Sequence, residues 1–134
     1  MAQVQSQNSS VEFTCRASSY NGMPTQGNVM VGNHAFEYYN EKNPQDYIQI
    51  PWDEVDYVSA EVIARRAITR FAIFTYKNGH FTFSARDNKA CLRAIREHVD
   101  ESRLVRSPNF MQVLVTGVRA IPHALAGLFS KRVR

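Results

Sequence analysis

Arginine is the residue type that gives this sequence its clearest capacity for recognition chemistry. The chain contains twelve Arg and four Lys, and the planar guanidinium group of arginine forms paired hydrogen bonds with carboxylates and phosphates. Residues 1–60 carry two basic and seven acidic residues, whereas residues 61–134 carry fourteen basic and five acidic ones. This division predicts that the second half contacts an acidic partner or surface. The alternative is that basic and acidic elements simply neighbour one another in the fold.

The side chains that could support catalysis or bind a metal follow no recognisable pattern. Asp53, Glu54 and Asp56 are clustered, but successive side chains on a strand point in opposite directions, which favours a solvent-exposed turn over an acid–base pair. The sequence has no GxSxG, P-loop, GxGxxG or HExxH motif. Its four histidines and two cysteines have no metal-ligand spacing, and Cys15 and Cys91 are expected to be free core thiols. We therefore predict no enzyme, no catalytic or metal-binding residues, no cofactor and no small-molecule substrate.

Composition and length predict a single globular domain. Hydrophobic residues make up 44% of the 134-residue chain and charged residues 21%, which is ordinary for a globular protein. No run of about 18–20 apolar residues could cross a bilayer. The first residues, MAQVQSQNSS, lack the features of a secretion signal, so we expect a cytoplasmic protein.

Alternating apolar and polar residues predict about seven strands before residue 86. Gly32-Asn33 suits a two-residue hairpin turn that would pair Val29 with Phe36 and Asn28 with Glu37. Later in the chain, Val58, Ala60, Val62 and Ala64 share one side of an extended strand.

Asn78-Gly79, between two alternating apolar runs, is the strongest local hairpin signal. A two-residue turn there would place Tyr76 opposite Phe81, Phe74 opposite Phe83, and Thr75 opposite Thr82. The four aromatic residues would share one face and form part of the core. An aromatic shelf for a ligand is the alternative interpretation.

The periodicity becomes helical after residue 86. Cys91, Leu92, Ile95 and Val99 lie at helical spacing, and Asp87 can cap the first turn. Ser107 and Pro108 suit the start of a second helical segment.

The last thirteen residues, 122–134, predict a short amphipathic helix that binds a partner. One side carries Leu125, Leu128, Phe129 and Val133, and the basic residues near or within it are Arg119, Lys131, Arg132 and Arg134. Such a helix could dock on an apolar partner surface while its cations meet acidic groups. The alternative is that the apolar stripe packs on the protein's own sheet.

Five blocks in order, YIQIPWDEVDYV, RFAI, KNGHFTFS, LRAIREHV and VRSPNF, give the chain a family resemblance from about residue 11 to residue 118. The chain resembles the ManO family of small proteins from mannose-type phosphotransferase operons of Gram-positive bacteria. The resemblance implies a pleckstrin-homology-like (PH-like) antiparallel β-barrel or sandwich capped by an amphipathic helix, a mainly β fold with C-terminal helices. The expected organisation is a disordered N-terminus (1–10), a PH-like domain with its capping helix (11–100) and a C-terminal helical extension (101–134).

The resemblance also implies a role in mannose-family sugar uptake. Together with the missing catalytic motifs and the basic second half, it favours a non-enzymatic accessory or regulatory protein. Its expected partners are the membrane subunits of the permease at the cytoplasmic membrane face, and an anionic membrane surface. The alternative is a DNA-binding transcriptional regulator of the mannose operon.

Overall fold

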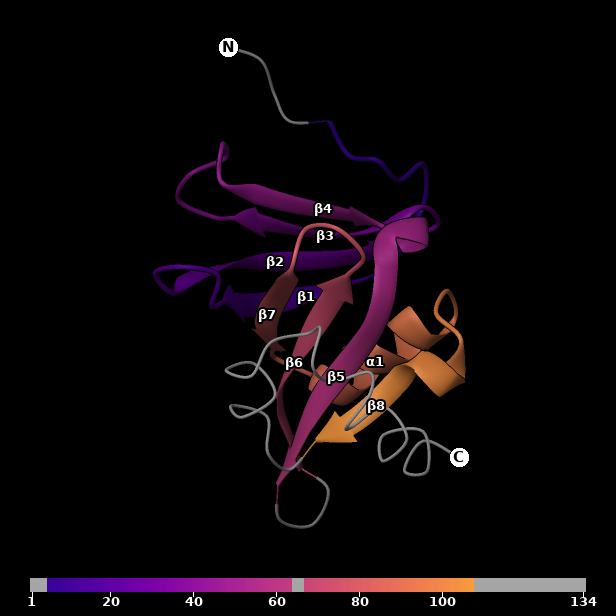
Figure 1. The fold of residues 1–134 in the computed structure, drawn as a ribbon. Helices are drawn as coiled ribbons and strands as arrows, with labels where there is room; N and C mark the ends of the chain where they lie inside the picture. The colour runs from indigo at the N-terminus through magenta and orange to yellow at the C-terminus, as the bar shows by residue number, and fades with distance from the viewer. Residues whose placement is uncertain (1–4, 64–66, 108–134) are drawn as a thin grey trace.

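The computed structural model describes residues 5–63 and 67–107, which form one curved sheet and one α-helix (Figure 1). The strands are β1 (Val11–Ser19), β2 (Thr25–Gly32), β3 (Ala35–Asn40), β4 (Tyr47–Pro51), β5 (Val55–Ile63), β6 (Ala67–Thr75), β7 (His80–Ala85) and β8 (Leu104–Ser107). The helix is α1 (Asn88–Arg96), and two short 3-10 helices are η1 (Trp52–Glu54) and η3 (Glu101–Arg103). No helix in the described ranges is long and apolar enough to span a membrane.

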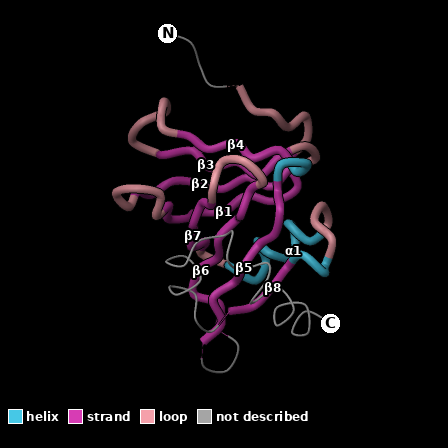
Figure 2. The backbone as a smooth tube through the Cα atoms, viewed as in Figure 1, coloured by secondary structure: helices cyan, strands magenta, loops and turns pink. Residues whose placement is uncertain are grey.

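The sheet bends back on itself around one core. Its strand order is β4-β3-β2-β1-β7-β6-β5-β8, antiparallel throughout except for the β5–β8 pair (Figure 2). Phe36 on β3 nevertheless contacts Phe83 on β7, with ring centroids 5.0 Å apart, and also contacts Phe71 on β6. Because two strands separate β3 from β7 in the sheet, these contacts require the two halves of the sheet to face each other.

Helix α1 closes one end of this core as the helical spacing predicted. Cys91, Ile95 and Val99 are buried in the core, and the Asp87 side chain accepts a hydrogen bond from the Ala90 backbone N–H. The predicted inward side of β5 is also confirmed at Val58 and Ala60, which belong to the same core.

The β2–β3 hairpin forms with a register that differs from the prediction by two residues. Val29 pairs with Tyr38, and Phe36 pairs with Val31. The connection is still two residues long but is Asn33-His34, one position later than predicted. The segment before β1 binds it there, since the Asn33 carboxamide oxygen accepts hydrogen bonds from the backbone N–H groups of Ser9 and Ser10. A shift of two preserves the predicted faces of the strand.

The β6–β7 hairpin differs by three residues, and the predicted partners Phe74 and Phe83 lie on opposite faces. Phe83 pairs with Phe71, whereas Phe74 pairs with His80. The turn is widened by Thr75, whose hydroxyl accepts from the Asn78 N–H and donates to the Gly79 carbonyl. An odd shift places the side chains of one strand on the opposite face relative to its partner. Phe83 keeps the predicted core face, and Phe74 therefore leaves the core.

Both ends of the predicted domain need correction where the structure describes them. Residues 5–10, expected to be disordered, run along the sheet and bind Glu37, which is fully buried: its carboxylate accepts hydrogen bonds from the Ser6 hydroxyl (2.6 Å) and the Gln7 backbone N–H (2.7 Å). Residues 101–107, expected to be helical, form η3 and β8, and β8 joins the sheet beside β5. The domain thus extends past residue 100, and residues 108–134 lie outside the described ranges.

Candidate functional site

A groove lies between helix α1 and the β5–β8 edge of the sheet. Its floor is apolar and comes from four elements: Val62 on β5, Ile68 on β6, Leu92 on α1 and Leu104 on β8. Two adjoining hollows of about 310 and 350 Å³ make up the groove. The floor side chains are only partly buried and pack against the core.

The rim of the groove is basic. Lys89, Arg93 and Arg96 lie at i, i+4 and i+7 on α1, which places them along one side of the helix. Arg106 on β8 completes the rim, and Glu101 is the acidic residue in the lining. Within the described ranges, none of these four cations forms an ion pair.

The N-terminal end of α1 is fixed to the sheet by Asn88. Its side-chain oxygen accepts from the Ala85 N–H at 2.8 Å, and its side-chain amide donates to the Ile68 carbonyl at 2.9 Å. One side chain therefore joins the helix to both β7 and β6, and sets the position of Lys89 beside it.

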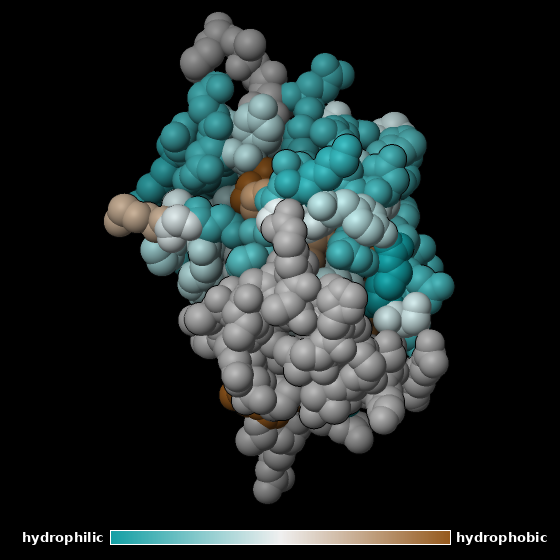
Figure 3. Space-filling model, viewed as in Figure 1, coloured by the Kyte–Doolittle hydropathy of each residue, from teal (hydrophilic) through white to brown (hydrophobic). Residues whose placement is uncertain are grey.

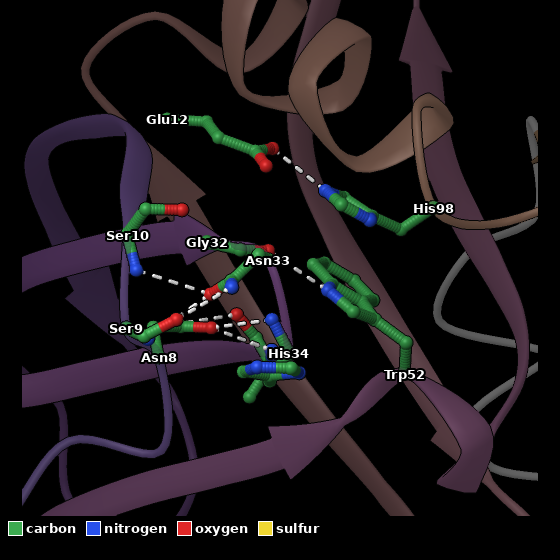
Figure 4. A network of polar contacts seen from close by, with 10 residues as sticks. Asn8, Ser9, Ser10, Glu12, Gly32, Asn33, His34, Trp52 and His98 are labelled. Atoms are coloured by element: carbon green, nitrogen blue, oxygen red, sulfur yellow. Dashed lines mark hydrogen bonds and ion pairs between the residues drawn. The ribbon is translucent and has the colours of Figure 1, made fainter.

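The residues just after α1 are fixed by a second set of contacts, drawn in Figure 4. The His98 ring lies flat against Trp52, with centroids 4.7 Å apart and an interplanar angle of 6°, and its Nε2 lies 2.6 Å from the Glu12 carboxylate. Trp52 in turn donates from its indole nitrogen to the Gly32 carbonyl. These contacts tie the helical wall of the groove to β1, β2 and η1.

The opposite wall is positioned by Arg103. Its guanidinium donates to the backbone carbonyls of Val55 and Asp56 and to the Tyr76 hydroxyl. Just before it, Asp100 accepts hydrogen bonds from the Ser102 N–H and hydroxyl, which hold the pKa of that carboxyl below its usual value. Strand β8 follows directly and pairs with β5 from Leu104 to Ser107.

The structure brings together part of the predicted basic surface. Arg93, Arg96 and Arg106 share the groove, whereas Arg70 forms an ion pair with Glu61 and Arg103 binds backbone carbonyls. All the predicted partner-binding residues lie outside the described ranges: Arg119, Leu125, Leu128, Phe129, Lys131, Arg132 and Arg134.

Sequence reasoning missed the apolar floor of the groove and the contribution of Lys89. The i, i+4, i+7 spacing of cations on the predicted helix was a usable signal for the rim. The floor had no such signal, because it depends on the parallel pairing of β8 with β5, which brings Leu104 beside Val58.

The acidic cluster and the two thiols of the described part of the chain do not line the groove. Asp53 and Glu54 lie exposed in η1, as the predicted turn requires. Cys15 and Cys91 are free thiols, and burial raises the pKa of the Cys91 thiol, which keeps it protonated. Among the described residues, no three His, Cys, Asp or Glu side chains form a group that could hold a metal ion. The arrangement with most capacity to bind is therefore the groove, which offers apolar contact and four cations together.

Solved structures with a similar fold identify the architecture. A C-terminal domain of an unknown protein from Leishmania infantum superposes with a TM-score of 0.59 at 11% identity, covering 66% of this chain and 83% of that one. The Vps36 N-terminal PH domain superposes with a TM-score of 0.52 at 15% identity, covering 72% of this chain and 89% of that one. The eight strands and single helix of the described ranges thus form a PH-like fold, as predicted.

Sequence comparison adds a family. No curated protein sequence matches the chain. Residues 3–118 match the family described as domain of unknown function DUF956, a range that includes the whole described sheet, α1 and the groove. The chain therefore belongs to the DUF956 family.

Proposed function

We propose that this protein is a non-enzymatic accessory protein of mannose-family phosphotransferase sugar uptake. In this proposal its groove binds an acidic, amphipathic segment of the permease membrane subunits at the cytoplasmic face. The groove carries the proposal: four cations without acidic partners in the described ranges surround an apolar floor. The link to sugar uptake is supported by the resemblance to the ManO family.

The chemistry of the groove favours a protein segment as ligand. Acidic side chains would meet the guanidinium groups of Arg93, Arg96 and Arg106, while apolar side chains would cover Leu92 and Leu104. Elsewhere the large exposed apolar side chains of the described ranges are scattered over different elements, and the described surface in Figure 3 is mostly hydrophilic. A groove that combines apolar area with unpaired charge is therefore distinctive here.

The chain's own C-terminal residues are a poor ligand for this groove. Residues 119–134 contain four cations and no acidic residue, so the basic rim repels them. DNA would satisfy the cations through its phosphates but would leave the apolar floor without a partner. Both arguments point to an acidic segment from another protein.

Co-purification from membranes that contain the permease tests the proposal. The tagged protein should enrich the permease subunits, and the change Arg96→Glu should reduce that enrichment at least about tenfold, as loss of a charge contact at an interface can. Lys77→Glu is the matched control, because Lys77 is exposed in the β6–β7 turn away from the groove. Equal enrichment by the two variants would contradict the proposal.

The DNA-binding alternative is tested in the same series. Gel shifts with operon promoter DNA and scrambled DNA should show at most weak, equal binding to both, which is expected of nonspecific basicity. Selective binding to the promoter that is lost in Arg96→Glu would favour the transcriptional regulator instead.

A further inference from the structure

The chain contains two Asn-Gly pairs, Asn21-Gly22 and Asn78-Gly79, and each lies in an exposed connection between two strands. An asparagine followed by glycine is chemically labile, because glycine has no side chain to shield its backbone nitrogen. That nitrogen can attack the neighbouring carboxamide, which is then lost as ammonia. In a folded protein the reaction requires an asparagine side chain that is free to turn towards the glycine nitrogen.

The Asn21 side chain is held by three hydrogen bonds. Its oxygen accepts from the Thr82 backbone N–H at 2.7 Å. Its nitrogen donates to the Ser19 hydroxyl at 2.8 Å and to the Thr82 carbonyl at 3.2 Å. The Tyr20 backbone N–H donates to the same carbonyl at 2.9 Å. Residues 20 and 21 thus extend the pairing of β1 with β7, and the Asn21 carboxamide cannot turn towards Gly22 without breaking these bonds.

The Asn78 side chain forms no hydrogen bond with any described residue. The turn is held through backbone groups instead, since the Asn78 N–H and the Gly79 carbonyl both bind the Thr75 hydroxyl at 2.8 Å. The Gly79 N–H also has no partner in the described ranges. Apart from its chain neighbours, no described atom lies within 4 Å of the position that a Cβ on Gly79 would take. Water and hydroxide can therefore reach both reacting groups.

We propose that Asn78 is a site of spontaneous deamidation in the folded protein, and that its hydrogen bonds protect Asn21. The Gly79 nitrogen gives its proton to hydroxide and forms a bond to Cγ of Asn78. The bond from Cγ to Nδ2 breaks, and the leaving nitrogen takes a proton from water and departs as ammonia. Water then opens the cyclic imide at either of its two carbonyl carbons. The product is aspartate at position 78 or its isomer isoaspartate, in which the backbone runs through Cγ.

The modification changes both the charge and the backbone of the β6–β7 turn. Either product adds a carboxylate beside Lys77. Isoaspartate also lengthens the backbone between residues 78 and 79 by one carbon. The Thr75 hydroxyl then cannot keep its bonds to the N–H of residue 78 and to the Gly79 carbonyl in the same geometry. The site therefore lies where a small covalent change acts on the contacts that set the width of the turn.

Incubation of the full-length protein in heavy-oxygen water at mildly alkaline pH tests the proposal. Each deamidation during the incubation introduces heavy oxygen into the new carboxylate, and peptide mass spectrometry reports it separately for Asn21 and Asn78. In the folded protein, Asn78 should be converted at least about tenfold faster than Asn21, which reacts only after local opening. In a sample unfolded in guanidinium chloride neither side chain is held, and the two rates should agree to within about threefold.

Three outcomes would overturn the proposal. Equal conversion of Asn21 and Asn78 in the folded protein would show that the hydrogen bonds of Asn21 give no protection. Conversion of Asn78 in the unfolded sample but not in the folded one would show that the β6–β7 turn blocks the attack. An equal preference for Asn78 in both samples would assign the difference to the neighbouring sequence instead of the fold.

Discussion

Phe83 lies where the two halves of the curved sheet meet. Its ring is fully buried and contacts Phe36 and Tyr38 from β3 and Phe71 from β6. Phe74, its predicted partner, stacks with Tyr57 on the outer face instead. The two phenylalanines thus stabilise different layers of the molecule.

Replacing Phe83 with Ala should lower the free energy of unfolding by about 3–5 kcal/mol, the usual cost of a large cavity in a core. Chemical denaturation monitored by circular dichroism measures the change. Met23→Ala serves as the control, because Met23 is 85% exposed and should change stability by less than about 0.5 kcal/mol. A Phe83 variant as stable as this control would place the residue outside the core.

His80 should make stability depend on pH. Burial lowers the pKa of His80 below its ordinary value of 6.5, so the unfolded chain takes up a proton at a higher pH than the folded one. Its contribution is therefore complete above about pH 6.5 and is lost as the pH falls through that value towards the folded-state pKa. His80→Phe should flatten this decline, measured as melting temperature across a pH series. An identical decline in the variant would assign the effect to other groups.

At the scale of elements, local interactions were predictable from sequence and non-local ones were not. Helix α1 and its Asp87 cap depend on neighbours within four residues, and both were predicted, although the helix ends at Arg96, before Val99. The hairpin registers were wrong because side-chain hydrogen bonds set where each turn lies. Thr75 widens the β6–β7 turn, and Asn33, bound by the backbone of Ser9 and Ser10, lies in a β2–β3 turn one position later than predicted. From the sequence alone, the charged side chain of Glu37 would be expected to lie exposed on its strand. In the structure, Ser6, Gln7 and Asn8 donate hydrogen bonds to its carboxylate.

The same distinction explains why the candidate site was only half predicted. The cations on one side of α1 could be predicted from their spacing in the sequence. The groove, however, forms only where β8 pairs in parallel with β5, which joins residues more than 40 positions apart. The contact between His98 and Glu12 spans 86 positions and has no sequence signature. The sequence thus predicted the charge of the site but not its shape.

The contacts of His98 should determine how firmly α1 is held. Trp52 is the single tryptophan of the chain, so its fluorescence reports the ring stacked on it. His98→Ala should change this fluorescence and lower stability by about 1 kcal/mol, as expected for loss of an aromatic pair. Glu12→Gln, which leaves the stacked ring in place, is the control and should change the fluorescence less. No response to His98→Ala would show that the stack does not persist in solution.

At the scale of the whole molecule, the groove beside α1 is the proposed partner-binding surface of a PH-like sheet. The N-terminal residues 5–10 bind the other half of that sheet, through the buried carboxylate of Glu37 and the Ala35 carbonyl. The described N-terminal segment and the proposed binding groove therefore lie on different parts of the sheet.

Deleting residues 122–134 should leave the fold intact and weaken binding to the permease. The deleted stretch includes Leu125, Leu128, Phe129 and three cations, and it follows residue 118, where the family match ends. We expect a melting temperature within about 2 °C of the full chain, since the described core cluster lies between residues 17 and 99, and reduced co-purification. A large loss of thermal stability would show that these residues belong to the core, and unchanged binding would show that they contact no partner.

Site-specific photo-cross-linking reports whether the groove is the partner-binding site. A photoreactive phenylalanine analogue replaces Leu92 in the groove floor or, as the control, Met23 in the exposed β1–β2 loop. Both variants are irradiated with membranes that contain the permease. Adducts with a permease subunit should form from position 92 and none should form from position 23. Adducts from position 23 alone, or from neither position while the protein still co-purifies with the permease, would contradict this role of the groove.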